Sequence, residues 1–260
     1  MPSTDDSTRT TLLRPGLCSV THRDLPPAQV VAVAADAGLQ CIEWGADVHV
    51  PVGDETNAAA VRGLTEDAGL AVASYGSYLR FADDGEPVAA ALATAAALGA
   101  PRIRVWAGNS GSAATGDTDR AAVVRRLRNA CELGAEAGIE LGLEFHGGTL
   151  TDDVDSTLAL LDEVDHDNLA TYWQPHQGMP TDEAVATLER VIDHVSTVHV
   201  FSWWPMAERH PLEARTDLWK AAIARLTDDG RPHDLLLEFV TDDDPAAVRR
   251  DGDSLRALLG

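Results

Sequence analysis

The chain has 260 residues, of which 42 are acidic and 20 are basic, and its formal net charge is −22. A surface this acidic repels phosphate backbones and anionic lipid, so the composition argues against nucleic acids and membranes as partners. No run of eighteen residues is free of polar side chains, so the sequence offers no candidate for a membrane-spanning helix.

Length and the opening residues predict a single-domain cytoplasmic protein. A chain of this size suits one large hydrophobic core. We expect a flexible tail over residues 1–12 and one domain over residues 13–260. The opening "MPSTDDSTRTT" carries acids where a secretory signal needs basic residues and an apolar segment.

The excess of acids favours a salt-rich cytoplasm, because molar salt screens the repulsion between surface carboxylates. An acidic protein from a GC-rich genome is the alternative. Codon bias toward arginine would explain why Lys220 is the only lysine.

The three cysteines, Cys18, Cys41 and Cys131, are odd in number and far apart. Their spacing fits neither a disulfide framework nor a zinc site. We therefore expect them to be buried as small apolar side chains.

Short apolar segments alternate along the chain with segments rich in Ala, Leu and Val, which is the pattern of a parallel α/β protein. The predicted strands are 16–20, 40–45, 71–76, 102–107, 140–146, 169–174, 197–203 and 235–240. The predicted helices are 26–37, 56–68, 86–98, 118–137, 153–164, 181–193, 216–227 and 245–259. Eight such units predict a (β/α)8 TIM barrel, because a doubly wound sheet rarely has that many.

Alternate residues of a barrel strand face either the helices or the barrel interior. With the apolar positions facing the helices, Phe239 should point outward. The polar and aromatic residues that should point inward are Glu43, Arg104, Trp106, Glu140, Glu144, His146, His199, Phe201, Trp203 and Glu238.

Two glutamates lie where apolar strands end, Glu144 in "LGLEFH" and Glu238 in "LLLEFV". A buried carboxylate needs a cationic partner, a proton or a metal ion to offset its desolvation. TIM barrels carry their chemistry at the C-terminal ends of the strands, and His199 falls at the same end. A divalent cation between these residues would neutralise both carboxylates. A buried ion pair with an inward arginine such as Arg104 is the alternative.

Four segments, "GLQCIEWGADVHVP", "LEFHGGTL", "VHVF" and "LLLEFV", lie at predicted strand ends. Together they resemble the xylose isomerase-like TIM barrels of the sugar isomerase and epimerase superfamily, over residues 14–259. Members of that family bind one divalent ion through Glu, Asp, His and Glu on strands five to eight. The resemblance implies a site for Mn²⁺, Mg²⁺, Co²⁺ or Zn²⁺ formed by Glu144, Gln174, His199 and Glu238.

Gln174 departs from the family pattern, which has Asp at this position. An amide oxygen in place of a carboxylate removes a negative charge, so affinity for Mg²⁺ and Mn²⁺ should fall. Two glutamates and a histidine can still hold Mn²⁺, Co²⁺ or Zn²⁺. His176 or Gln177 could complete the coordination.

The resemblance implies proton transfer on a keto-sugar or a polyol-derived ketose. The ion stabilises an enediolate, and Glu144 and Glu238 remove and return the proton, as in an isomerase or epimerase. One alternative is a lyase or dehydratase that uses the same site on an oxidised sugar or inositol. Another is a non-catalytic carbohydrate-binding barrel, which Gln174 favours.

Further residues near the predicted mouth are candidates for substrate binding. They are His49, Tyr75, Trp106, His146, His176, Trp203 and Arg209. Loop capping by His49 with Asp47, rim packing by the aromatic rings and a solvated charge at Arg209 are the alternatives. Few basic residues are expected near the mouth, which favours an unphosphorylated small-molecule sugar. The sequence leaves the oligomeric state open, a homo-oligomer included.

Overall fold

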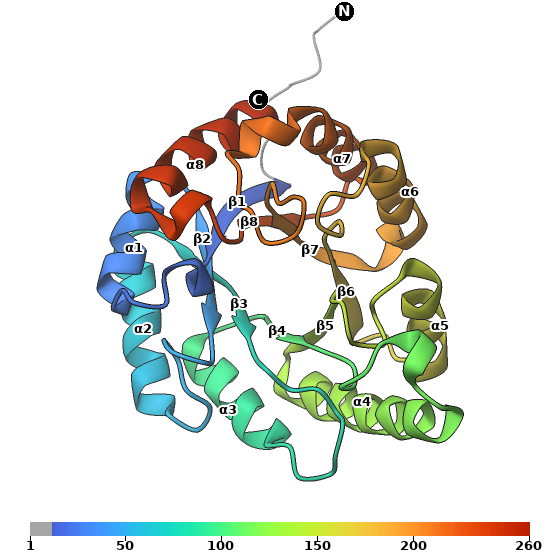
Figure 1. Cartoon of the computed structure of the whole chain (residues 1–260). Helices are drawn as coiled ribbons and strands as arrows, with labels where there is room; N and C mark the ends of the chain where they lie inside the picture. The colour runs from blue at the N-terminus through green and yellow to red at the C-terminus, as the bar shows by residue number, and fades with distance from the viewer. Residues whose placement is uncertain (1–11) are drawn as a thin grey trace, which may run out of the picture.

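A computed structural model describes residues 12–260 and shows a closed barrel of eight parallel strands surrounded by eight helices (Figure 1). The strands pair in chain order around the barrel, and β8 closes it on β1. The TIM-barrel prediction is therefore confirmed. The predicted tail lies almost entirely outside the described residues.

The strands are β1 (Leu13–Cys18), β2 (Cys41–Gly45), β3 (Ala71–Gly76), β4 (Arg102–Val105), β5 (Glu140–Glu144), β6 (Leu169–Trp173), β7 (Val195–Val200) and β8 (His233–Leu237). The helices are α1 (Pro27–Asp36), α2 (Glu55–Asp67), α3 (Val88–Leu98), α4 (Asp117–Ala137), α5 (Val154–Val164), α6 (Thr181–Val191), α7 (Thr216–Asp229) and α8 (Pro245–Leu259). Short 3-10 turns lie at η2 (Ser19–His22), η3 (Ser112–Ala114), η4 (Ile192–His194), η5 (Leu212–Arg215) and η6 (Thr241–Asp243).

Local sequence sets several helix ends. The Asp153 carboxylate accepts the backbone N–H of Ser156 and caps the start of α5, which satisfies one of the free N–H groups there. Gly99 and Gly138 end α3 and α4 in the left-handed region, at φ +74° and +69°. Glycine reaches this region without a steric penalty, so the chain can turn directly into the next strand.

The main core fills the space between the strands and the helices, as expected for strands with one apolar face. A second, small cluster fills the interior of the barrel and contains Cys18, Val20, Cys41, Ala73 and Leu236. All three cysteines are free and buried, as predicted.

Ion pairs close the barrel interior at the N-terminal end of the strands. Asp234 accepts from Arg14 at 2.7 Å and from Arg102 at 2.8 Å, and Arg102 also contacts Glu140 at 3.2 Å. This end is therefore filled by paired charges, and the functional side chains must enter from the opposite end.

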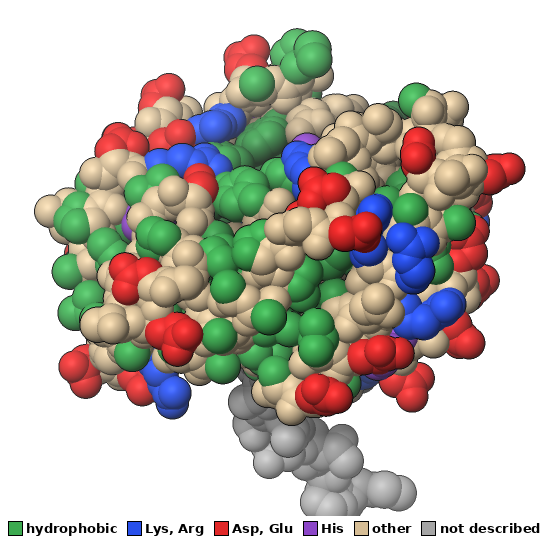
Figure 2. All heavy atoms as spheres, turned by 90° about the horizontal axis from the view of Figure 1, so that it is seen from below, with side chains coloured by type: hydrophobic (Ala, Val, Ile, Leu, Met, Phe, Trp, Pro, Cys, Tyr) green, Lys and Arg blue, Asp and Glu red, His purple; other side chains and the backbone are tan. Residues whose placement is uncertain are grey.

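The outer surface carries separate acidic side chains spread over the side shown in Figure 2, with arginines among them. No helix within residues 12–260 is both long and apolar enough to cross a membrane.

Two inward and outward assignments from the sequence are wrong. Phe239 was expected to face the helices, but β8 ends at Leu237 and Phe239 takes a positive φ of +52°, which turns its ring toward the barrel mouth. Tyr75 was expected at the mouth, but a register shift between β2 and β3 turns Ser74 inward toward Glu43. The next side chain, Tyr75, therefore points into the outer core, where its hydroxyl donates to Val50 O at 2.8 Å.

Candidate active site

Four polar side chains from successive strands meet at the C-terminal end of the barrel. Glu144 ends β5, His199 lies near the end of β7, and Gln174 and Glu238 directly follow β6 and β8. The Nδ1 atom of His199 is 3.5 Å from Glu238 Oε2 and 3.7 Å from Glu144 Oε1. The structure thus brings together the four residues that the family resemblance implied as ligands.

Gln174 connects two of these residues. Its side-chain amide donates to Glu144 Oε1 at 3.2 Å and to Phe145 O at 2.6 Å. Its Oε1 atom accepts from His199 Nδ1 at 2.8 Å. The amide oxygen and the imidazole nitrogen therefore face each other, and both atom types can bind a metal ion.

Glu144 is the most strongly bound carboxylate of the site. Its Oε2 atom accepts from Arg104 Nη1 and from the indole Nε1 of Trp106, both at 2.5 Å. Burial alone raises the pKa of a carboxyl group, but Arg104 and His199 hold the pKa of Glu144 far below its usual range. Glu144 is therefore an ionised carboxylate with little tendency to accept a proton.

Glu238 has a different environment. It is 6% exposed, and its one ionic contact within 4.0 Å among the described side chains is His199. Burial and then the negative charge of Glu144 raise the pKa of Glu238, although His199 opposes them. The two glutamates are therefore unequal: Glu238 binds a proton far more readily than Glu144 does.

Glu43 lies on the other side of the histidine ring. His199 Nε2 is 3.7 Å from Glu43 Oε1, while Ser74 donates to the second oxygen of Glu43 at 2.6 Å. Arg104 Nε is 3.4 Å from Glu43, so one guanidinium bridges Glu43 and Glu144. Burial lowers the pKa of His199. The acidic groups around the ring, Glu238 above all, outweigh burial and raise this pKa well above its ordinary value.

The charge of the site suits a divalent cation. Glu43, Arg104, Glu144 and Glu238 are between 2% and 6% exposed, so water screens them little. Three carboxylates and one guanidinium leave two negative charges when His199 is neutral. Ligand atoms about 2.0–2.6 Å from one ion lie about 3 Å or more apart, and the nitrogen-to-oxygen separations of 3.5 and 3.7 Å are close to that spacing. The donor set therefore fits such an ion.

Two groups of predicted substrate-binding residues lie at the mouth. On one side, the Trp106 ring is 4.7 Å from the ring of His146. On the other, the Trp203 ring is 5.4 Å from the ring of Phe239, and the guanidinium of Arg209 stacks on Phe239 at 4.4 Å. Both groups can contact a ligand at Glu144 and Glu238.

Two other candidates bind only parts of the chain itself. His49 is buried, with Nδ1 at 3.0 Å from Ser19 Oγ and Nε2 at 3.0 Å from Leu25 O. These contacts match the alternative in which His49 stabilises a loop, and they occupy both of its ring nitrogens. His176 is exposed, and its Nε2 contacts Asp152 O at 2.7 Å.

Sequence reasoning missed Ser74, Phe239, Arg23 and Arg80 near the mouth. Ser74 was obscured by the strand irregularity, and Phe239 by the early end of β8. Arg80 in "YLRF" follows a predicted strand, and this position alone could have identified it.

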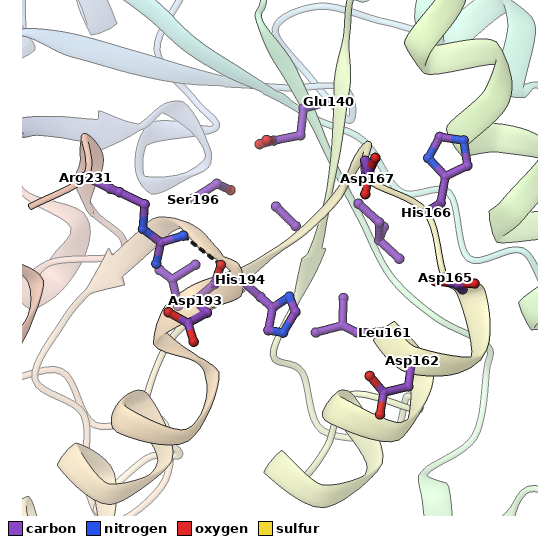
Figure 3. Close-up of a pocket in the computed structure, with 13 residues that line it drawn as sticks. Glu140, Leu161, Asp162, Asp165, His166, Asp167, Asp193, His194, Ser196 and Arg231 are labelled. Atoms are coloured by element: carbon purple, nitrogen blue, oxygen red, sulfur yellow. Dashed lines mark hydrogen bonds between the residues drawn. The ribbon is translucent and has the colours of Figure 1, made fainter. Parts of the chain in front are cut away.

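A cavity of about 650 Å³ lies far from this site, at the N-terminal ends of β5, β6 and β7 (Figure 3). Acidic side chains such as Asp162 and Asp193 line it, and Arg231 donates to Asp193 O at 2.6 Å. Residues at this end of a TIM barrel usually serve stability. The two clusters of close metal-binding side chains found within residues 12–260 both lie near His199.

A family model described as xylose isomerase-like TIM barrel matches residues 31–258. Among curated proteins, 3-dehydroshikimate dehydratase from Bacillus anthracis is 48% identical over 68 residues, which are 26% of this chain. The chain spans only 24% of the length of that relative.

Similar solved structures extend over the whole barrel. The probable 3-DHS dehydratase AsbF from Bacillus anthracis has a TM-score of 0.78 and 22% identity, covering 94% of this chain and 98% of that one. D-allulose 3-epimerase from Methylomonas sp. has a TM-score of 0.71 and 16% identity, covering 95% and 98%. A xylose isomerase-like TIM barrel protein from Mycobacterium smegmatis in complex with magnesium has a TM-score of 0.69 and 16% identity, covering 95% and 96%. At these identities the likeness shows the fold.

Proposed function

The chain belongs to the xylose isomerase-like TIM barrel family, and we propose that it is a metal-dependent enzyme acting on a small hydroxy ketone. The proposed reaction removes a proton from the carbon beside the carbonyl and passes through an enediolate. The convergence of Glu144, His199 and Glu238 at the barrel mouth is the observation that carries this proposal.

Glu144, Gln174, His199 and Glu238 would hold the ion. A bound Mn²⁺, Mg²⁺, Co²⁺ or Zn²⁺ supplies positive charge that polarises the carbonyl and offsets the charge of the enediolate. Arg104 and Trp106 fix Glu144 from the side away from His199, which leaves the other carboxylate oxygen directed at the site. Burial raises the pKa of Glu238, so Glu238 is the better proton acceptor of the two glutamates.

The inequality of the two glutamates favours a dehydratase. Glu238 takes the proton from carbon and returns it to a hydroxyl group on the next carbon. The carbon–oxygen bond then breaks, the electron pair of the enediolate forms the new carbon–carbon double bond, and water leaves. One acid–base group is enough for this elimination, and Glu144 remains ionised throughout. The segment that is 48% identical to 3-dehydroshikimate dehydratase supports the same choice.

An epimerase or isomerase is the second candidate. Glu144 and Glu238 approach His199 from strands that lie apart around the rim, as two bases on opposite faces of a substrate would. D-allulose 3-epimerase shares the barrel and supports this candidate. An epimerase requires Glu144 to exchange protons as well. The hydrogen bonds that Glu144 accepts from Arg104 and Trp106 stabilise its ionised form and so oppose this exchange.

A direct test incubates the Mn²⁺-loaded protein in D₂O with 3-dehydroshikimate and, separately, with D-allulose. A dehydratase converts the first compound to an aromatic dihydroxybenzoate, which ultraviolet absorption detects. An epimerase instead changes the second compound and incorporates deuterium, which NMR detects. Glu238→Gln should stop either reaction while the protein still folds. Full binding of metal without turnover of either compound would favour the non-catalytic carbohydrate-binding barrel.

A further inference from the structure

The mouth of the barrel carries a collar of arginines, defined as Arg23, Arg80, Arg104 and Arg209. Six arginine–aromatic stacking contacts occur in the part of the chain that the structure describes, and all six involve this collar. The aromatic partners are Tyr78, Trp106, Trp203 and Phe239. The expectation of few basic residues near the mouth is therefore wrong.

Three collar arginines already have carboxylate partners. Arg23 contacts Asp47 at 2.6 Å, Arg104 contacts two site glutamates, and Arg209 contacts Asp243. The backbone N–H of Arg80 donates to Glu86, but its guanidinium has no carboxylate oxygen within 4.0 Å among residues 12–260.

Most of the hydrogen-bonding capacity of Arg80 is free. Its guanidinium makes one hydrogen bond to the protein, from Nη1 to Gly108 O at 3.3 Å. A guanidinium has five N–H donors. In a chain of net charge −22, a half-buried cation without an anionic partner is the exception.

Trp106 contacts both Arg80 and the catalytic residue Glu144. The Arg80 Cζ atom lies 4.1 Å from the centroid of the Trp106 ring, and the indole Nε1 of the same ring donates to Glu144 at 2.5 Å. Arg80 thus lies over the face of the indole whose N–H edge contacts Glu144, so a ligand beside this indole can reach both residues.

We propose that Arg80 binds a carboxylate group of the substrate, so that the substrate is a hydroxy-keto acid rather than a neutral sugar. This inference rests on the proposed function. Arginine suits the task, because its planar fork of N–H groups matches both oxygens of a carboxylate. Stacking on Trp106 holds that fork in one orientation before the substrate arrives. The collar also offsets the negative potential that the acidic surface imposes on an anionic substrate.

A competing explanation gives the collar a purely internal role, in which it only offsets the charges of Glu43, Glu144 and Glu238. Arg104 already meets two of these carboxylates directly. If Arg80 did no more than this, its loss would change the affinity for the metal ion. It would not change the preference between an acid and a neutral ligand of the same shape.

The test uses two matched probes, 3,4-dihydroxybenzoate and 3,4-dihydroxybenzamide, titrated calorimetrically into the Mn²⁺-loaded protein. They share the metal-chelating hydroxyls and differ in charge. The native protein should bind the acid more tightly than the amide. Arg80→Met should weaken binding of the acid roughly tenfold or more and leave binding of the amide unchanged, because a charge-assisted contact is lost. Arg80→Lys should retain part of the preference.

Arg128→Met is the matched control. Arg128 also lacks a carboxylate partner within the described chain, but it lies on α4 and donates to Val164 O and Glu163 O. This variant should bind both probes as the native protein does. Equal affinity of the native protein for acid and amide, or an equal loss of both in Arg80→Met, would overturn the proposal. The protein could also prefer the acid through Arg80 and yet turn over no substrate. That result would contradict the proposed function and leave the role of Arg80 supported.

Discussion

The Nε2 atom of His199 lies 3.7 Å from Oε1 of Glu43, and both side chains are almost completely buried. This nitrogen has no hydrogen-bond partner within the described structure. A carboxylate on one side of a histidine ring commonly fixes the ring so that its other nitrogen can bind a metal ion. We therefore expect Glu43 to act as a positioning residue for His199.

Glu43→Gln should lower the affinity for Mn²⁺ by about 10- to 100-fold, the usual effect of losing such a partner. The amide no longer offers a full negative charge to the His199 N–H. Glu43→Asp keeps the charge and should recover part of the affinity. Calorimetric titration of the three proteins checks this. Native affinity in Glu43→Gln would show that Glu43 serves only the ion pair with Arg104.

Gln174→Glu should raise the affinity for Mn²⁺ roughly tenfold, because a charged ligand replaces a neutral one at nearly constant size. The same change should lower the melting temperature of the metal-free protein. The Gln174 amide now donates to Glu144 and Phe145 O, and a carboxylate there would repel both. Gln174→Met, which offers no oxygen, is the control and should bind the ion more weakly. Unchanged affinity in Gln174→Glu would place residue 174 outside the coordination sphere.

The sequence predicted the barrel and the centre of the site because both depend on short-range patterns. Apolar strands, helix-ending glycines and strand alternation are local features, and together they placed Glu144, His199 and Glu238 at one end of the barrel. Two errors arose where the alternation of inward and outward side chains breaks down. The register shift between β2 and β3 directs the Tyr75 side chain into the outer core, and the positive φ of Phe239 turns its ring into the mouth.

Two arginines of the collar, Arg23 and Arg80, were missed for another reason. They lie in loops, which carry no periodic signal. Only the folded barrel places them over the rings of Phe239 and Trp106, which Arg209 and Arg104 also contact. Their function therefore had to be inferred from contacts.

Stability should depend on pH through His49. Burial lowers the pKa of this histidine below its ordinary value, so the folded state binds a proton less readily than the unfolded state. By linkage, the free energy of unfolding falls as the pH falls below about 6.5, where only the unfolded form is protonated. Denaturant titrations at pH 7.5 and 5.5 should show a smaller loss for His49→Gln than for the native protein. His176→Gln, at an exposed position, should behave as the native protein does. An identical loss in His49→Gln would contradict this assignment.

Salt should stabilise the protein. Acidic residues exceed basic ones by 22, and Figure 2 shows acidic side chains spread over one face of the molecule. Screening weakens both the surface ion pairs and the general repulsion, but an exposed ion pair contributes little. The repulsion should therefore dominate, and the melting temperature should rise between 0.1 and 2 M KCl, in keeping with a salt-rich cytoplasm. A melting temperature that stays constant or falls would leave codon bias as the better explanation of the composition.

The proposed function depends on the binding of one divalent ion by Glu144, His199 and Glu238 at the barrel mouth. The most direct test is calorimetric titration of chelator-treated protein with Mn²⁺, in parallel for the native chain and for His199→Asn. The native chain should bind one ion per molecule. His199→Asn should show little or no binding. A native chain that binds no ion, or a variant that binds as tightly as the native chain, would contradict the claim.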